Sequence, residues 1–261
     1  MNEDVEASSS LIQRIVSLID LTNLNDDCDE AAIEALCKQA NTPVGCVAAV
    51  CIWPAYVAIA KKYLDQHSSV SIATVANFPS GNDTLAANCE TIRKALEDGA
   101  NEIDYVLPYK ALMNGETSTV ASALKSVRSC VPDNTPLKVI LESGVLDSAE
   151  LISKAAHIAI DEGADFIKTS TGKVSVNATP EAADIMLEAI ASANKNVGFK
   201  AAGGIKTVTE ASTYLALAEN RFGPSWITAS HFRFGASSLL QNALVSLDGV
   251  SPAASGNSNA Y

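Results

Sequence analysis

Short apolar runs rich in Val and Ile alternate with segments of helical period along most of the chain. Each run is bounded by turn residues and is too short for a buried helix, so we expect it to be a β-strand. Eight runs fit this description, at 17–21, 47–52, 71–76, 102–107, 137–141, 165–169, 197–201 and 232–234. Because strands that alternate with helices form parallel sheets, the pattern predicts an α/β fold.

The segments between the runs carry apolar residues at helical spacing. Two apolar faces are expected, one at Leu85, Cys89, Ile92 and Leu96 and one at Met186, Ile190 and Ala193. Thr179 is expected to cap the second of these helices, since its hydroxyl can accept a backbone hydrogen bond and Pro180 suits the first helical position. The helices should form a ring outside the strands.

No linker rich in Pro or Ser divides the 261 residues, and this length is ordinary for a single eight-stranded barrel. We therefore predict a single-domain TIM (β/α)8 barrel over residues 1–248. Residues 249–261 are rich in Ser, Ala, Asn and Gly and lack apolar periodicity, so they are expected to be a mobile tail that ends in Tyr261.

Composition and charge narrow the functional classes. A net charge of −12 argues against general binding of nucleic acid or anionic lipid, which would be repelled. No stretch reaches the roughly 18 apolar residues of a membrane span, and the N-terminus is acidic, so a cytoplasmic protein is expected. The six cysteines form no CxxC pair, which predicts reduced thiols and no zinc site.

One local repeat bears on chemistry. Residues 97–104 and 161–168 share an acidic helix end, a Gly-Ala turn and a strand, which places Asp104 and Lys168 at the same height on strands four and six. Because alternate strands of such barrels fill the same interior layer, these two side chains should face each other. Lys200 ends strand seven, so three ionisable groups are expected to converge.

A lysine at the end of an apolar strand is unusual, because burying an unpaired ammonium is costly. The simplest alternative is that Lys168 emerges into solvent. Two facing lysines favour a different interpretation, since like charge and desolvation should lower the pKa of one of them and yield a neutral amine that can attack a carbonyl. Asp104 could then move protons.

The chain resembles the deoxyribose-phosphate aldolase family in an ordered set of short runs. They are DLTNLND at 20–26, AVCIWP at 49–54, NFPSGN at 77–82, FIKTSTGK at 166–173, NATPE at 177–181, GFK at 198–200 and FGASSL at 234–239. The set extends over nearly the whole chain, which makes it far more specific than any one motif.

The resemblance implies reversible cleavage of 2-deoxy-D-ribose 5-phosphate to D-glyceraldehyde 3-phosphate and acetaldehyde, in deoxynucleoside catabolism, by a homodimer with no metal or other cofactor. It implies that Lys168 forms a Schiff base with the substrate. Lys200 would perturb the pKa of Lys168 and assist proton transfer, and Asp104 would be the proton-relay carboxylate.

Further substrate contacts are expected around the mouth of the barrel. Turns after adjacent strands carry the candidates for phosphate binding by backbone amides, which are Gly203, Gly204, Gly235, Ser237 and Ser238. The other expected contacts are Asp20, Thr171, Lys173 and Lys206, with Tyr261 as a possible lid. A plain turn, a solvated lysine and an inert chain end are the simpler alternatives for Gly203, Lys173 and Tyr261.

Two positions depart from the family pattern. Ala201 stands where proline is expected, which should loosen the adjoining loop, and Lys206 stands where arginine is commoner. A lysine is a point charge, so it cannot make the bidentate phosphate contact of an arginine.

Three alternatives stay open. The chain could be another lysine-dependent aldolase or a transaldolase that shares Lys168, or a catalytically silent barrel that binds a sugar phosphate. Cys51, near the end of strand two, could react with electrophilic aldehydes, although a small buried hydrophobic side chain is the commoner role for such a cysteine.

Overall fold

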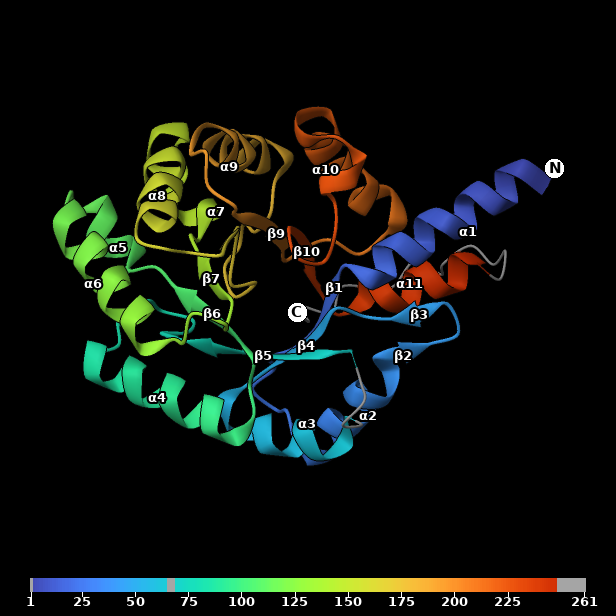
Figure 1. The fold of residues 1–261 in the computed structure, drawn as a ribbon, viewed down its shortest axis with the longest axis horizontal. Coiled ribbons are helices and arrows are strands. Elements are labelled where there is room, and N and C mark those ends of the chain that lie inside the picture. The colour runs from blue at the N-terminus through green and yellow to red at the C-terminus, as the bar shows by residue number, and fades with distance from the viewer. Residues whose placement is uncertain (1, 65–68, 248–261) are drawn as a thin grey trace.

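Eight parallel strands close into a barrel (Figure 1). The computed structural model describes residues 2–64 and 69–247, so the expected tail and Tyr261 lie outside the described residues. The barrel strands are β1 (Ile19–Asn23), β4 (Ala49–Ile52), β5 (Ser71–Ala76), β6 (Glu102–Val106), β7 (Leu137–Ile140), β8 (Phe166–Lys168), β9 (Gly198–Ala202) and β10 (Phe232–Ala236). Each of the eight expected runs overlaps one of them, and β1 pairs with β10 to close the ring. The predicted TIM barrel is confirmed.

Helices surround the barrel, as the sequence predicts (Figure 1). The longer ones are α1 (Asn2–Ser17), α2 (Glu30–Gln39), α4 (Leu85–Asp98), α6 (Thr117–Cys130), α8 (Ala149–Asp161), α9 (Pro180–Ser192), α10 (Val208–Phe222) and α11 (Ser238–Leu247). The shorter ones are α3 (Val57–Tyr63), α5 (Tyr109–Met113) and α7 (Ser143–Leu146). None of the helices in the described residues is long and apolar enough to cross a membrane.

Helix ends follow the expected local chemistry. Thr179 accepts a hydrogen bond from the backbone N–H of Ala182, and Pro180 opens α9 as predicted. Gly99 and Gly163 adopt φ values of 114° and 92°, in the left-handed region that glycine tolerates. Both halves of the local repeat therefore end a helix and begin a strand in the same way.

The expected apolar face of α4 is partly wrong. Leu85 is 44% exposed, and the buried residues of this helix are Asn88, Ile92 and Ala95. The inner stripe includes a polar residue, Asn88, whose side chain donates to the backbone carbonyl of Asp83. A pattern of hydrophobic letters alone could not place an asparagine on the buried side.

Cys89 and Cys130 form a disulfide between α4 and α6, with Cα atoms 5.7 Å apart. The expectation that all six cysteines are thiols is therefore wrong for these two. Their 41-residue separation gave no spacing signal, and it is the packing of the two helices against each other that brings them together. Cys28, Cys37, Cys46 and Cys51 are free.

A short antiparallel hairpin, β2 (Asn41–Thr42) with β3 (Gly45–Cys46), precedes β4 and was not expected. Two-residue strands are too short to show an alternating pattern. The hairpin lies outside the barrel wall (Figure 1).

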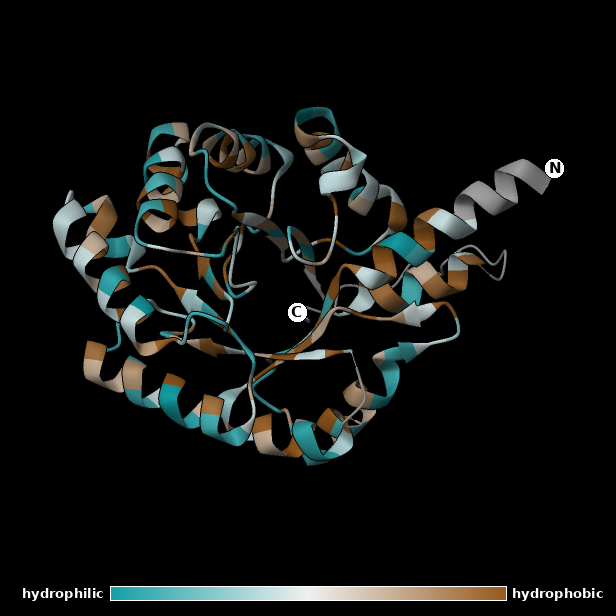
Figure 2. Ribbon diagram, in the orientation of Figure 1, coloured by the Kyte–Doolittle hydropathy of each residue, from teal (hydrophilic) through white to brown (hydrophobic). Residues whose placement is uncertain are grey.

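Successive strand residues point alternately outward and inward. The outward residues pack under the helices in the main core, including Val50, Ile103, Val139 and Ile167. Figure 2 shows brown, hydrophobic segments alternating with teal, hydrophilic ones along the surrounding helices. One side of the barrel interior is filled by a second apolar group, formed by Leu24, Ala49, Cys51, Ala73 and Val75. The opposite side is filled by charged side chains.

Gly198 illustrates how tightly the strands pack. A Cβ at this position would lie 2.4 Å from the ring of Phe166, its neighbour in the register between β8 and β9. We predict that Gly198→Ala lowers the free energy of unfolding by about 1–3 kcal/mol, because an extra methyl group in a packed core forces side chains to shift. Urea denaturation measures this change.

The double variant Gly198→Ala/Phe166→Leu is the control. Since the smaller leucine removes part of the clash, the two changes together should cost less than the sum of their separate costs. Strictly additive costs would contradict the proposed contact.

Candidate active site

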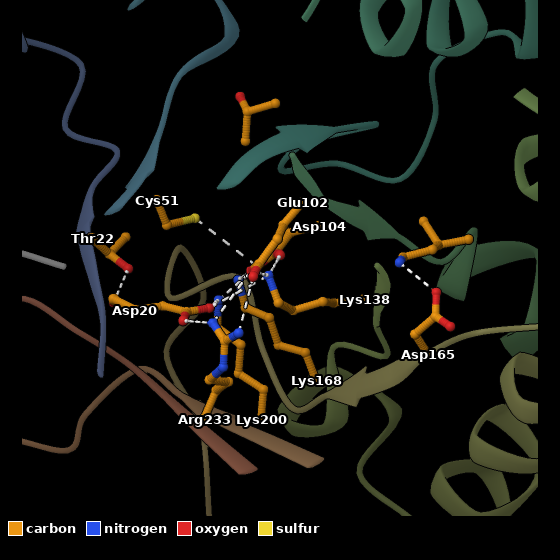
Figure 3. Close-up of polar contacts among 12 residues, drawn as sticks. Asp20, Thr22, Cys51, Glu102, Asp104, Lys138, Asp165, Lys168, Lys200 and Arg233 are labelled. Carbon is orange, nitrogen blue, oxygen red and sulfur yellow. Dashed lines mark hydrogen bonds and ion pairs between the residues drawn. The ribbon is translucent and has the colours of Figure 1, made fainter. Parts of the chain in front are cut away.

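Seven charged side chains meet inside the barrel, and we call them the buried charge cluster (Figure 3). They come from six of the eight strands: Asp20, Glu102, Asp104, Lys138, Lys168, Lys200 and Arg233. Glu102 and Asp104 both point inward because they are two residues apart on β6. The residues that alternate with cluster members, such as Ile103 and Phe199, point outward into the main core.

Asp104 lies at the centre of the buried charge cluster. Its Oδ2 atom accepts hydrogen bonds from Lys168 Nζ at 2.9 Å and from Lys200 Nζ at 2.8 Å. Its Oδ1 atom accepts from Lys138 Nζ at 2.9 Å. The expected convergence of Asp104, Lys168 and Lys200 is therefore confirmed, and the alternative in which Lys168 emerges into solvent is excluded because this side chain is buried.

Three members of the cluster were missed by the sequence analysis. Lys138 contacts Glu102 at 2.6 Å, and Arg233 contacts both Glu102 at 2.9 Å and Asp20 at 2.5 Å. Lys138 and Arg233 each interrupt an apolar strand, in the runs LKVI and FRFGA. This is the signal that singled out Lys168, and applying it to every strand would have found them.

Attraction between opposite charges dominates the ionisation of the cluster. The pKa of Asp104 lies well below its ordinary value, because three lysines outweigh the cost of burial. Burial by itself would lower the pKa of Lys168, but attraction to Asp104 outweighs it and the pKa is raised. The expectation that one of the two facing lysines has a lowered pKa is therefore not met at Lys168 in the resting cluster, because Asp104 lies between the two amines.

Glu142, which follows β7, is a further buried carboxyl that the sequence analysis missed. It has φ of 60°, and its Oε2 accepts from the Thr171 hydroxyl at 2.6 Å while its Oε1 accepts from the Thr171 N–H at 3.1 Å. Burial raises the pKa of Glu142. The contact fixes the turn after β8, which carries Thr171 and Lys173.

Gly203 and Gly204 lie on the turn after β9, as expected, whereas Gly235 belongs to β10 and not to a turn, because this strand extends to Ala236. The Gly203 N–H donates to the Gly235 carbonyl at 3.3 Å, and both Gly203 and Gly204 have positive φ, at 83° and 86°. Ser237 directly precedes α11, and Ser238 is its first residue. Gly204 is exposed, and the amides of such a turn, together with the N-terminus of α11, suit an anion.

Gly235 has a packing reason as well. A Cβ there would lie 2.8 Å from the Cβ of Ala202 and 3.1 Å from Cε of Lys200. The missing side chain therefore leaves room for Lys200 inside the barrel.

The remaining expected site residues lie in different places. Asp20 belongs to the buried charge cluster, where it binds Lys200 at 2.5 Å. Lys173 Nζ lies 3.6 Å from Asp26, and Lys206 is exposed on the turn after β9. Ala201, which stands where proline was expected, is a buried residue of β9 in register with Phe234.

Cys51 points toward the cluster, with its sulfur 4.0 Å from Asp104 Oδ2 (Figure 3). Burial, together with the negative charge of Asp104, raises the pKa of its thiol. Since the thiolate is the nucleophile, this environment favours the unreactive, hydrophobic role.

Within the described ranges, no group of three or more His, Cys, Asp and Glu side chains is arranged to hold a metal ion.

Comparison with known proteins identifies the family. The model of the DeoC/LacD family aldolases matches residues 14–242. A deoxyribose-phosphate aldolase from Agrobacterium fabrum is 52% identical over 238 residues, which cover 91% of this chain and 92% of that protein. The chain belongs to the DeoC/LacD aldolase family.

Solved structures share the barrel of this DeoC/LacD aldolase. A candidate deoxyribose-phosphate aldolase from Toxoplasma gondii ME49 has a TM-score of 0.84 at 23% identity, with 94% of this chain and 97% of that chain covered. The deoxyribose phosphate aldolase of Aeropyrum pernix, described as tetrameric, has a TM-score of 0.73 at 21% identity, covering 96% and 100%. At these identities the likeness shows the fold alone.

Aldolases make or break a carbon–carbon bond next to a carbonyl carbon. In this family member the buried charge cluster offers two groups suited to that chemistry, a primary amine on Lys168 and a carboxylate on Asp104 within hydrogen-bonding distance. The second apolar group, which includes Cys51, lies beside these charged residues in the barrel interior.

Asp104→Asn should make Lys168 a better nucleophile outside the catalytic cycle. Removing the carboxylate charge lowers the pKa of Lys168, so carbamylation by cyanate at pH 7 should become on the order of tenfold faster. Peptide mapping by mass spectrometry measures the rate at Lys168. Unchanged or slower carbamylation, relative to the exposed control Asp133→Asn, would refute the pairing.

Glu142→Gln should change the pH dependence of stability. The folded-state pKa of Glu142 is raised above its ordinary value of 4.5, so the native protein loses stability as pH rises from that value through the folded-state pKa. The free energy of unfolding of Glu142→Gln minus that of the native chain should therefore be larger at pH 8 than at pH 5. Urea denaturation at both pH values checks this.

The exposed control Glu150→Gln should show no such pH-dependent difference. A difference for Glu142→Gln of the opposite sign would mean that the carboxylate, and not the neutral acid, is the form that the fold favours.

Proposed function

We propose that this chain is a deoxyribose-phosphate aldolase that cleaves 2-deoxy-D-ribose 5-phosphate to D-glyceraldehyde 3-phosphate and acetaldehyde through a Schiff base on Lys168. The single observation that supports this most is the sharing of one oxygen, Asp104 Oδ2, by the amines of Lys168 and Lys200. In a member of an aldolase family, such an arrangement places a nucleophilic amine beside a group that can exchange protons with it.

The reaction begins when Lys168 passes a proton to Asp104 and attacks C1 of the open-chain sugar as a neutral amine. Loss of water from the carbinolamine gives a protonated imine, which withdraws electrons from the neighbouring carbons. The ammonium group of Lys200 lies 2.8 Å from Asp104 Oδ2. Its positive charge favours the carboxylate form of Asp104, so Asp104 can give back at a later step the proton that it took from Lys168.

The bond that breaks joins C2 and C3, because acetaldehyde keeps C1 and C2. A base takes the proton of the C3 hydroxyl, C3 becomes the carbonyl carbon of D-glyceraldehyde 3-phosphate, and the electron pair of the bond moves into the imine to give an enamine. Protonation of the enamine at C2 and hydrolysis of the new imine then release acetaldehyde and the free amine. We assign the proton transfers to Asp104 and Lys200.

We propose that the turns after β9 and β10 hold the phosphate, through amides near Gly203, Gly204, Ser237 and Ser238. The positive φ of the two glycines and the start of α11 at Ser238 support this. Local capture of the anion is needed because the protein as a whole carries a charge of −12. Lys173 and Lys206 are expected to add positive charge near this site.

The reaction as proposed needs no metal or other cofactor, since the protonated imine withdraws the electrons. The cytoplasmic location, the homodimer and the use of Tyr261 as a lid stay predictions. The Aeropyrum pernix protein is described as tetrameric, so the assembly of that protein differs from the dimer expected here.

Borohydride reduction in the presence of 2-deoxyribose 5-phosphate tests the proposal. The native chain should gain the mass of a reduced imine, and peptide mapping should locate it on Lys168. Lys168→Ala should gain no such mass and should lose cleavage activity by at least about 10³-fold, since nucleophilic catalysis is removed.

The surface variant Lys125→Ala is the matched control and should form the adduct as the native chain does. An adduct on another lysine in the native chain, or substrate binding with no adduct, would overturn the Schiff base on Lys168. If the native chain forms an adduct with dihydroxyacetone phosphate and none with acetaldehyde, it is an aldolase with a different donor.

A further inference from the structure

The buried charge cluster is not electrically balanced. Among the described residues it holds four cationic side chains and three carboxylates. All seven are buried, so water screens this excess positive charge poorly. Loss of one proton would make the numbers equal.

The cations differ in how many carboxylates they contact. Lys138 lies within 3.5 Å of three, namely Glu102, Asp104 and Asp20. Lys200 contacts Asp20 and Asp104. Among the carboxylates of the described residues, Lys168 forms an ion pair with Asp104 alone, at 2.9 Å, and it shares that carboxylate with both other lysines.

Arg233 cannot be the group that loses the proton, because an arginine side chain in a protein stays charged. It holds Asp20 Oδ1 at 2.5 Å and Glu102 Oε1 at 2.9 Å, and these are the carboxylates that Lys200 and Lys138 would otherwise have to themselves. Arg233 is itself held in place, because its guanidinium lies 5.7 Å from the centre of the Phe166 ring. Because Arg233 takes up part of the negative charge of Asp20 and Glu102, Lys138 and Lys200 are stabilised more by Asp104. Less of the negative charge of Asp104 is then left to stabilise the ammonium form of Lys168.

Glu102 acts in the opposite direction. Its ion pair with Lys138 at 2.6 Å is the shortest of the three that this lysine makes. Glu102 therefore balances much of the charge of Lys138, and more of the negative charge of Asp104 is left to stabilise the ammonium form of Lys168. Neither Glu102 nor Arg233 has a contact with Lys168 among the ion pairs of the described residues.

We propose that Glu102 and Arg233 are positioning residues that act on Lys168 through the other members of the cluster, with Arg233 favouring loss of its proton and Glu102 opposing it. The proposal rests on the proposed function, in which Lys168 must become a neutral amine. In this proposal, Glu102 and Arg233 set the fraction of Lys168 that is a neutral amine at a given pH.

The pH dependence of Lys168 must be judged against every ionisable group that faces it. These groups are Asp104 on β6, Lys138 on β7, Lys200 on β9, Cys51 on β4 and Glu142 after β7. None of them is altered in the test below, so a change in the titration of Lys168 can be attributed to Glu102 or Arg233.

The test measures the titration of Lys168 directly, by NMR of protein with ¹³C at the lysine ε carbon, with the Lys168 signal assigned by its loss in Lys168→Met. The midpoint should move to lower pH in Glu102→Gln and to higher pH in Arg233→Met, each by on the order of one pH unit. Arg233→Lys keeps the charge and should stay close to the native midpoint.

The double variant Glu102→Gln/Arg233→Met keeps the excess of one positive charge and should also titrate near the native midpoint. A merely structural role predicts loss of stability in each single variant without shifts of opposite sign. Shifts in the same direction, or none, overturn the proposal. If a single variant does not fold, the other one and the double variant still decide, since each has its own predicted midpoint.

A second readout separates this proposal from the proposed function. The pH profile of borohydride trapping with acetaldehyde should move with the NMR midpoint in each variant. NMR shifts of opposite sign without any trapped imine would uphold the control of the amine and refute the Schiff base. A trapped imine on Lys168 with an unmoved NMR midpoint would uphold the Schiff base and overturn the role of Glu102 and Arg233.

Discussion

The carboxylate of Asp104 is the constraint on which the rest of the site depends. It keeps two lysine amines at 2.9 and 2.8 Å from one oxygen, in the buried interior of the barrel. Without that negative charge, burying the ammonium groups would cost several kcal/mol for each ion. The same contact holds Lys168 in its charged form, so a chemical step at this amine must begin by moving a proton.

The closed barrel makes this arrangement possible. Alternate residues of each strand point inward, so six strands can each direct one or two charged groups to the same interior layer while their outward neighbours build the apolar core. Small residues leave the space that the large interior side chains need. Gly235 leaves room for the side chain of Lys200, and Gly198 leaves room for the Phe166 ring beside Arg233.

Much of the fold could be predicted from the sequence, because strand and helix periods differ and the strand runs are short and rich in Val and Ile. The convergence of Asp104, Lys168 and Lys200 also followed, since strand order and height are enough to place them. Lys138 and Arg233 were missed because charges within apolar runs were considered only on the strands that carry Asp104, Lys168 and Lys200. The bond between Cys89 and Cys130 depends on how two helices pack, which no local pattern contains.

The most direct test of the central claim observes the covalent bond and the cleavage in one sample. Protein with ¹⁵N at the lysine ζ position is mixed with 2-deoxyribose 5-phosphate that carries ¹³C at C1, and NMR follows both. The account predicts a one-bond coupling between ¹³C and ¹⁵N that is absent in Lys168→Ala, together with release of labelled acetaldehyde. Release of acetaldehyde at the native rate by Lys168→Ala would contradict it.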